Sequence, residues 1–566
     1  MPRSSGRQLR LALAIIVPSL SMALYPPSAA LADESLLAET VVQTATFQNQ
    51  PAESVLPSSQ YVEGSVTEAF ADGATTTPAS QEPVARSYSG SSMGSVLACS
   101  CCNSECCTKE DKVAATKAMK SAYSGLFFGN NFSYLRDPCY DGPNFCGESL
   151  KNMDTRFGTI SVGGETRFRY HNERNFRGAN GLTGNDDNFW LFRQRLYADW
   201  QMTNNVRVYG ELLDANSSGE TFQPLIIEEN DLDIQNLFVD LKLFDSGDSS
   251  LVTRIGRQEL LYGAQRTVSP LDWANTLRTF EGVRALYQRG DFSLDAFWTR
   301  PVNVVPKAED RSDEKEDFFG AYATMNNVGS GSLEAYYLGY NSDNTSAISI
   351  LNRNFTFHTL GGRSLGKTDG GMLYDFEGAY QFGDNNTDAS HSAGFVALGL
   401  GRKMASTPLQ PTIWGWYDYA SGEEDFDERS IGDGGYHHLF PLAHKYNGFM
   451  DLFGRRNLHD INTQIITPLG DRITMLVWYH YLLLAEDTVP YNLVMIPYNQ
   501  AGNAAEDREL GHEIDILFNI NLNPRNNILL GYSHFSGGDY FDSATIGPVD
   551  EDNDADFFYA QFQTRY

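Results

Sequence analysis

The chain has 566 residues, with 42 basic and 72 acidic side chains and a formal net charge of −30. This charge argues against nucleic-acid binding, because neutralising phosphates requires surplus Lys and Arg. Beyond the N-terminal segment no stretch approaches the roughly 20 consecutive apolar residues of a membrane helix, which excludes a helical membrane protein. The 50 Gly, 29 Tyr and 34 Phe residues fit a large β protein with many turns.

The first 98 residues predict no folded domain. Residues 1–32 are typical of a Sec-type signal peptide, because three arginines precede an apolar run and Ala30-Leu31-Ala32 resembles a cleavage site. A short membrane anchor is the alternative, but the run is short and contains Pro18. Residues 33–98 are rich in Ser, Thr, Ala, Gln and Pro, so we expect a disordered linker.

All seven cysteines lie in or next to a small segment over residues 99–157. In an oxidising compartment they favour local disulfides, and the odd number leaves one thiol over, with a connectivity that the spacing does not determine. A metal site is the alternative, but the spacing matches no standard zinc pattern. Apolar residues at helical intervals predict a helix over 109–128, so we expect a periplasmic cap or plug. The disulfide candidates are Cys99, Cys101, Cys102, Cys106, Cys107, Cys139 and Cys146.

From residue 158 to residue 566, apolar and polar residues alternate with period two. At the C-terminus, Phe558, Phe562 and Tyr566 share one face, and Gln561 and Gln563 share the other. Such segments are about 9 to 12 residues long, which is enough for a tilted strand to cross a bilayer. About 18 of them can be counted, so the sequence predicts an all-β fold, a transmembrane antiparallel β-barrel.

The connections between these segments carry an independent signal. Those after even-numbered strands are short and turn-like, whereas those after odd-numbered strands are mostly long, with an exception near Asn385. Short turns on one rim and long loops on the other are typical of outer-membrane barrels. A secreted β-sandwich, propeller or β-helix is the alternative, but it does not require such alternation, and no fixed-period repeat is visible.

The polar face of the predicted strands is densely ionic and is expected to line the lumen. One interpretation is that these charges neutralise one another across strands. The other is that surplus Arg in the first six strands forms an electropositive stripe that attracts carboxylated or sulfated solutes. The candidate pore-lining and substrate-binding residues are Arg167, Arg169, Arg193, Arg195, Lys242, Arg257, Glu259, Arg266, Asp272, Arg278, Arg284, Asp375, Glu377 and His480.

Much of the negative charge falls in the predicted long loops, around residues 228–233, 309–317, 423–428 and 550–556. On the outer side such loops could share Ca²⁺ with lipopolysaccharide, although none has EF-hand spacing. Solvated acidic loops are therefore the main interpretation. No other cofactor and no resident metal are predicted.

Several blocks resemble the alginate export family of outer-membrane proteins. The most specific are Arg254–Gly263, Ser269–Asn275 and Arg278–Arg284, and the resemblance covers residues 158–566. Further similar blocks are Phe192–Leu196, Tyr374–Gln381, His444–Gly448 and Asp451–Gly454. The resemblance implies an 18-stranded barrel whose Arg-lined lumen passes an anionic uronic-acid polymer out of the cell.

Three functions remain open for a barrel in the cell outer membrane. The first is a channel for an alginate-like anionic polysaccharide or other anionic solutes, with possible periplasmic export partners. The others are a general diffusion or nutrient-uptake porin and an anchor or adhesin with a plugged lumen. Enzymatic activity is not expected, because Ser, His and acidic residues form no nucleophile motif. Outer-membrane lipid and lipopolysaccharide are the expected surroundings, and whether the loop over residues 421–456 gates the pore is open.

Overall fold

A computed structural model describes residues 107–177, 182, 184–344, 353–384, 390–424, 434–498, 507–542 and 553–566. The expected signal peptide, the linker and the four cysteines before Cys107 lie outside these residues, as do residues 425–428 and 550–552 of the predicted acidic loops. Within the described residues, no helix combines the length and the apolar character needed to cross a membrane.

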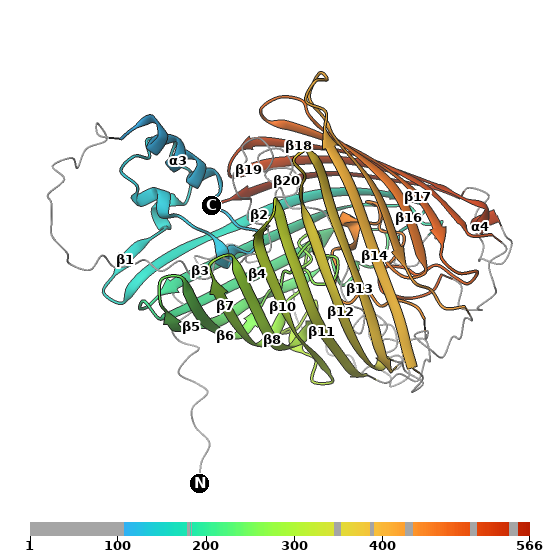
Figure 1. Cartoon of the computed structure of the whole chain (residues 1–566), viewed down its shortest axis with the longest axis horizontal. Coiled ribbons are helices and arrows are strands. Elements are labelled where there is room, and N and C mark those ends of the chain that lie inside the picture. Colours follow the sequence, from blue (N-terminus) through green and yellow to red (C-terminus); the bar gives the residue numbers. More distant parts are fainter. Residues whose placement is uncertain are drawn as a thin grey trace, which may run out of the picture. The chain divides into compact units, whose positions relative to one another are not determined.

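A small segment precedes the barrel and begins with the helix α3 (Lys109–Lys120), shown in blue in Figure 1. The helix starts at a capping box, in which the Thr108 hydroxyl accepts from the Asp111 N–H and the Asp111 carboxylate accepts from the Thr108 N–H. Short elements follow: the 3-10 helices η2 (Phe127–Gly129), η3 (Ser133–Arg136) and η4 (Glu148–Leu150), then the strand β1 (Met153–Thr155).

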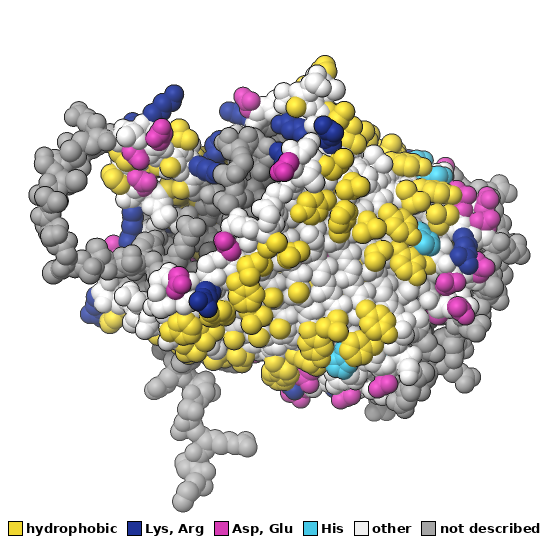
Figure 2. Space-filling model, in the orientation of Figure 1, with side chains coloured by type: hydrophobic (Ala, Val, Ile, Leu, Met, Phe, Trp, Pro, Cys, Tyr) yellow, Lys and Arg dark blue, Asp and Glu magenta, His cyan; other side chains and the backbone are white. Residues whose placement is uncertain are grey.

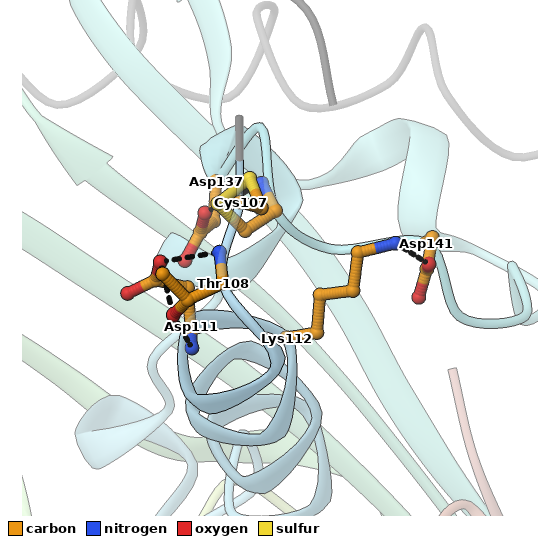
Figure 3. The surroundings of a disulfide bond; sticks show 7 residues. Cys107, Thr108, Asp111, Lys112, Asp137 and Asp141 are labelled. Carbon is orange, nitrogen blue, oxygen red and sulfur yellow. Dashed lines mark hydrogen bonds and ion pairs between the residues drawn. A yellow bond between two sulfur atoms is a disulfide. The ribbon is translucent and has the colours of Figure 1, made fainter. Parts of the chain in front are cut away.

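One disulfide staples this segment. Cys107, just before α3, is bonded to Cys139, and the ion pair between Lys112 and Asp141 lies beside it (Figure 3). Among the described cysteines, Cys146 is exposed and not disulfide-bonded. The staple fixes the start of the helix to the loop after η3.

The described strands form a closed antiparallel barrel of 18 strands, which confirms the predicted fold (Figure 1). Each strand pairs with its neighbours in the chain, and β2 pairs with β20 to close the sheet. Closure removes the unpaired edges that a membrane would penalise. The strands are β2 (Gly158–Arg174), β3 (Asp187–Gln201), β4 (Val206–Ser218), β5 (Asn230–Asp245), β6 (Ser249–Gln258), β7 (Phe280–Arg289), β8 (Phe292–Asn303), β10 (Glu316–Val328), β11 (Gly331–Asn344), β12 (Arg353–Lys367), β13 (Met372–Asp384), β14 (Ser390–Lys403), β15 (Thr412–Ala420), β16 (Leu458–Pro468), β17 (Ile473–Leu484), β18 (Glu509–Asn523), β19 (Asn526–Gly537) and β20 (Asp554–Arg565).

The period-two alternation separates the two faces of the barrel wall. On β3, Trp190 and Leu196 are exposed on the outside, whereas Arg193, Arg195 and Tyr197 are buried inside. Hydrophobic side chains spread over the outer wall, and charged groups gather toward its ends (Figure 2). An apolar outside and an ionic inside are what lipid and a polar lumen require.

The two rims differ in the length of their connections. One carries short turns, such as those after β3, β7 and β18, and the other carries the long connections, including those after β6, β15 and β17. In outer-membrane barrels the short turns are periplasmic. The short 3-10 helix η6 (Ala443–Lys445), the two-residue strand β9 (Arg311–Ser312) and the helix α4 (Asp539–Asp542) lie in the long connections.

Two of the long connections fold into the barrel. We call residues 259–279 loop A and residues 434–457 loop B. They meet at an isolated parallel bridge between Val268 and Phe440, where Phe440 donates to the Thr267 carbonyl and Ser269 donates to the Phe440 carbonyl. Both loops are largely buried. The core of the molecule is thus built between the strands and these two loops.

Candidate functional site: the lumen

A cluster of guanidinium groups lines the lumen on β2 and β3. Arg167 and Arg169 alternate with the outward-facing Phe168, and Arg193 and Arg195 pair beside them on the neighbouring strand. All four arginines are 2% exposed or less. We call these four residues the arginine wall.

The arginine wall holds the backbone of loop A. Arg167 donates to the carbonyls of Asp272, Trp273 and Ala274, over distances of 2.7 to 3.1 Å. Arg169 donates to the Trp273 carbonyl at 3.0 Å, and its guanidinium lies 3.3 Å from the centre of the Trp273 ring. These carbonyls of loop A are buried away from water, so each needs a hydrogen-bond donor from the protein, and the two arginines supply it. The interior arginines are therefore structural anchors as well as charges.

Two arginines of this wall are paired with carboxylates. Arg193 lies 2.7 Å from both Glu165 and Asp272. Burial acts to raise the pKa of Asp272, but Arg193 and Arg167 overcome it and hold that pKa well below its usual range. Asp272 therefore stays ionised at neutral pH. Arg195 is paired with Glu211 and Glu259.

The other two arginines have no such partner. Within the described residues, no carboxylate lies within 4 Å of Arg167 or Arg169, and their side-chain partners are the amides of Asn275 and Gln561. A guanidinium keeps its charge under all ordinary conditions. In the described part of the chain, no direct ion pair therefore neutralises Arg167 or Arg169, although the four arginines of the wall are matched in number by four carboxylates, Glu165, Asp272, Glu211 and Glu259.

The opposite chemistry lies on β13, β15 and β18, where strand carboxylates bind cations and N–H groups of the loops. Arg266 of loop A lies 2.7 Å from Glu377, and Arg455 of loop B lies 3.1 Å from Asp418. Glu513 and Asp515 accept from the backbone N–H groups of Met450 and Phe449 in loop B. We call the residues Asp375, Glu377, Asp418, Glu513 and Asp515 the carboxylate wall.

Loop A spans the distance between the two walls. Its Trp273 side is fixed to β2 and β3, and its Arg266 is fixed to β13. Leu271 and Leu277 have φ angles of 61° and 60°, in the left-handed region that is costly for residues with a Cβ. Such a backbone persists only where its surroundings dictate it. The loop therefore crosses the lumen in one defined conformation.

Lys445 of loop B adds a titratable cation beside the carboxylate wall, close to Asp375 and Glu377. Burial, with the nearby charges of Arg363 and Arg266, lowers the pKa of Lys445 to about 7. Its ammonium lies 3.4 Å from the Ala264 carbonyl of loop A. The charge in this part of the lumen therefore changes near neutral pH.

Other sequence-predicted residues also face inward, but they are held in local pairs. Arg284 binds Asp295, and Arg278 donates to the Ser269 and Pro441 carbonyls. Lys242 lies 3.2 Å from Asp245 near the short-turn rim. His480 lies 2.9 Å from Asp460 and 3.6 Å from Asp515. Outside the arginine wall, many charged side chains of the lumen are thus neutralised by partners on neighbouring strands.

The prediction that Arg257 lines the lumen is wrong. Arg254 faces inward on β6, so the period of two places Ile255 and Arg257 on the outer face, where Ile255 is 47% exposed. Arg257 instead donates to the carbonyls of Ile234 and Asp310. Arg257 thus binds the connection between β8 and β10 on the outside of the barrel wall.

Sequence reasoning missed several inward residues. Arg363 on β12 binds Asp375 at 2.7 Å and Glu334 at 3.4 Å, but it follows two glycines that obscured the alternation. Tyr262, Tyr322 and Tyr336 form a stack with ring centres 5.0 and 5.3 Å apart. Tyr322 on β10 and Tyr336 on β11 could have been identified as inward-facing from the period-two alternation of their strands. Tyr262 lies in loop A, where no period exists.

No metal site stands out in this part of the molecule. Over the described ranges, no group of three or more His, Cys, Asp or Glu side chains is arranged to hold an ion. The loop histidines are engaged otherwise: His444 pairs with Asp451 at 2.7 Å and stacks on Trp273. Burial lowers the pKa of His444 well below its usual value, so it is neutral at pH 7.

Comparisons with known proteins agree with the sequence resemblance. A family model described as "Alginate export" matches residues 159–551. No curated protein matches the chain. Solved structures with a similar fold include OccD3 (OpdP) of Pseudomonas aeruginosa, which is 12% identical with a TM-score of 0.46 and covers 75% of this chain and 98% of its own.

Two further structures have the same level of similarity. OccAB1 of Acinetobacter baumannii is 12% identical, with a TM-score of 0.49 over 74% of this chain and 99% of its own. A BenF-like porin from Pseudomonas fluorescens Pf-5 is 12% identical, with a TM-score of 0.47 over 72% of this chain and 98% of its own.

Proposed function

The chain belongs to the alginate export family, and from this premise we propose that it passes an anionic, uronic-acid-type polysaccharide or its oligomers through its lumen. It is an outer-membrane channel of the porin type. Its role is transport and not catalysis. The proposed signal peptide, residues 1–32, delivers it to the periplasm for insertion into the outer membrane.

The observation that carries this proposal is that, among the described residues, no carboxylate lies within 4 Å of Arg167 or Arg169 of the arginine wall. Arg167 and Arg169 bind carbonyls and amides, whereas Arg193 and Arg195 are matched by carboxylates. Carbonyl dipoles fix a guanidinium without cancelling its charge. In a low-dielectric lumen, such uncompensated charge raises the local concentration of anions and lowers that of cations.

Each sugar of a uronic-acid polymer carries one carboxylate, so the chain presents a regular line of negative charge. A field from fixed guanidinium groups attracts such a chain without holding any one unit tightly. Conduction requires this balance, because a solute must enter readily and also leave.

The test is single-channel current through the refolded full chain in a planar bilayer, with uronate oligomers added. We expect the oligomers to block the wild-type current, and Arg167→Gln with Arg169→Gln to weaken the block strongly. Arg300→Gln is the matched control, because Arg300 pairs with Asp317 and both are one-third exposed. Unchanged block in the double variant would overturn the proposal.

A second candidate is a general diffusion porin. It is favoured by the local pairing of Arg284 with Asp295 and of Arg195 with Glu211, which confines the field of those arginines. This candidate predicts an open current that uronate oligomers do not affect. The same recording therefore separates the two functions.

A further inference from the structure

The segment before the barrel lies outside the family match and contacts the lumen at the short-turn rim. Its residues Leu126, Phe127 and Phe128 are 4%, 1% and 3% exposed. They form one apolar cluster with Tyr197, Tyr209, Phe238 and Leu261, the first three of which face inward on β3, β4 and β5. We call Leu126–Gly129 the wedge.

The first ring of the wedge lies on the arginine wall. The Phe127 ring centre is 5.7 Å from that of Tyr197 and 4.1 Å from the Arg195 guanidinium. Next to it, the Asn130 amide lies 3.3 Å from the Tyr197 hydroxyl. A guanidinium over an aromatic face is an attractive arrangement, strengthened where water is excluded. The wedge thus covers the end of the arginine wall nearest the short turns.

The second ring covers a platform of stacked aromatic rings. Tyr209 and Phe238 are stacked with ring centres 5.2 Å apart, and Phe128 meets both edge-on at 5.7 and 5.2 Å. The Arg254 guanidinium lies 4.3 Å from the Phe128 ring, and Arg207 donates to the Phe128 carbonyl. The backbone of the wedge therefore contacts the barrel wall, as its aromatic rings do.

Two cationic side chains fix the rest of the segment at the same rim. Arg525, in the turn between β18 and β19, donates to the Tyr134 hydroxyl at 2.8 Å and lies 3.3 Å from Glu148. Lys151 donates to the carbonyls of Val162 and Tyr566 at 2.6 and 3.0 Å. Arg525 lies at the turn before β19, whereas Lys151 lies at the closing pair of β2 and β20. The segment is held at more than one point of the rim.

From this geometry we infer that residues 107–157 form a plug of the periplasmic mouth, with the wedge as its inserted part. The wedge occupies wall area that a passing solute would contact, including the faces of Arg195 and Arg254. Passage then requires the wedge to withdraw, which uncovers an aromatic and cationic surface. The inference concerns access and holds whatever solute the lumen selects.

The first test compares conductance in planar bilayers for the full chain and for Phe127→Ser with Phe128→Ser. We expect a several-fold higher mean conductance in the double variant, because its wedge loses the apolar contacts that hold it. Phe157→Ser is the matched control, since Phe157 is 58% exposed and should leave the current unchanged. Equal conductance in the wild type and the double variant would overturn the inference.

A second measurement does not depend on current. Tyr209 is fully buried, so Tyr209→Cys should react slowly with a charged thiol reagent while the wedge is in place. Adding Phe127→Ser and Phe128→Ser should raise the reaction rate about tenfold or more, because local opening then costs little. The protein that keeps Tyr209 is the control, because its reaction rate is that of the native cysteine thiols alone. Fast reaction with the wedge intact would overturn the inference, whereas a wild-type current that uronate oligomers do not block would overturn only the proposed function.

Discussion

The two walls of the lumen bind the same loops with opposite chemistry. On β2 and β3, strand guanidinium groups such as Arg167 donate to carbonyls of loop A. On β13, β15 and β18, strand carboxylates such as Glu377 and Glu513 accept from loop cations and N–H groups. Ion pairs neutralise Glu377 and Asp418 on the second wall. Arg167 and Arg169 on the first wall bind carbonyls instead, and a carbonyl holds a guanidinium without cancelling its charge.

The largest expected effect is on the carboxylate wall, at its contact with loop A. Arg266→Ala removes the cation bound to Glu377 and leaves this buried carboxylate with the Tyr336 hydroxyl but without its ion pair. Breaking a buried pair in this way costs about 3–5 kcal/mol. Denaturant unfolding in lipid vesicles should show this loss. Arg300→Ala, which breaks a partly exposed pair, should cost no more than about 1 kcal/mol; equal losses in the two variants would contradict the account.

Trp273→Ala probes the contact of loop A with the arginine wall. The ring lies against Arg169 and stacks on His171 and His444. Its removal should cost about 3 kcal/mol in unfolding free energy, and the current should become noisier as the loop loosens. Trp298→Ala is the control, because Trp298 is 48% exposed on the outer wall. A quiet, unchanged current in Trp273→Ala would contradict a defined loop conformation.

Asp418→Asn tests whether neutralisation on the carboxylate wall needs charge. The change keeps the size of the side chain but removes the charge that faces Arg455. We expect a loss of about 2 kcal/mol in the same unfolding assay, since hydrogen bonds between charged groups are stronger than neutral ones. Asp317→Asn, on the outer wall, should change little. An unchanged unfolding free energy in Asp418→Asn would mean that the shape of this side chain, and not its charge, holds loop B in place.

The smallest effect concerns pH. The pKa of Lys445, lowered to about 7, means that this side chain gains its proton as pH falls from 8 to 6. Positive charge in the lumen then rises, so the preference for anions should increase over this range. Reversal potentials recorded at both pH values measure it. Lys445→Met should remove most of the pH dependence, and a preference that strengthens with rising pH would contradict the assignment.

Much of the barrel could be predicted from the sequence, because a strand with two different faces shows its period directly. The expected starts near residues 206, 331, 372 and 412 coincide with those of β4, β11, β13 and β15. The same period, followed strictly from Arg254, would have placed Arg257 on the outside. The charged residues of β6 lie on both faces of the wall, so charge alone does not identify the interior face.

The loops could not be predicted in the same way. Arg167 and Asp272 are 105 residues apart, and no periodicity relates an inward strand residue to the carbonyl of a distant loop. Likewise, the helix near residue 109 was predictable from its apolar spacing, but the contact of Phe128 with Phe238 depends on the closed barrel. Contacts of this kind are determined by tertiary packing alone.

The charge retained by Arg167 and Arg169 is tested most directly by the reversal potential of the wild-type channel in a salt gradient. If the arginine wall retains its charge, the channel prefers anions, and Arg167→Gln with Arg169→Gln shifts the reversal potential toward zero. Preference for cations in the wild type, or a double variant with an unchanged potential, would contradict the account.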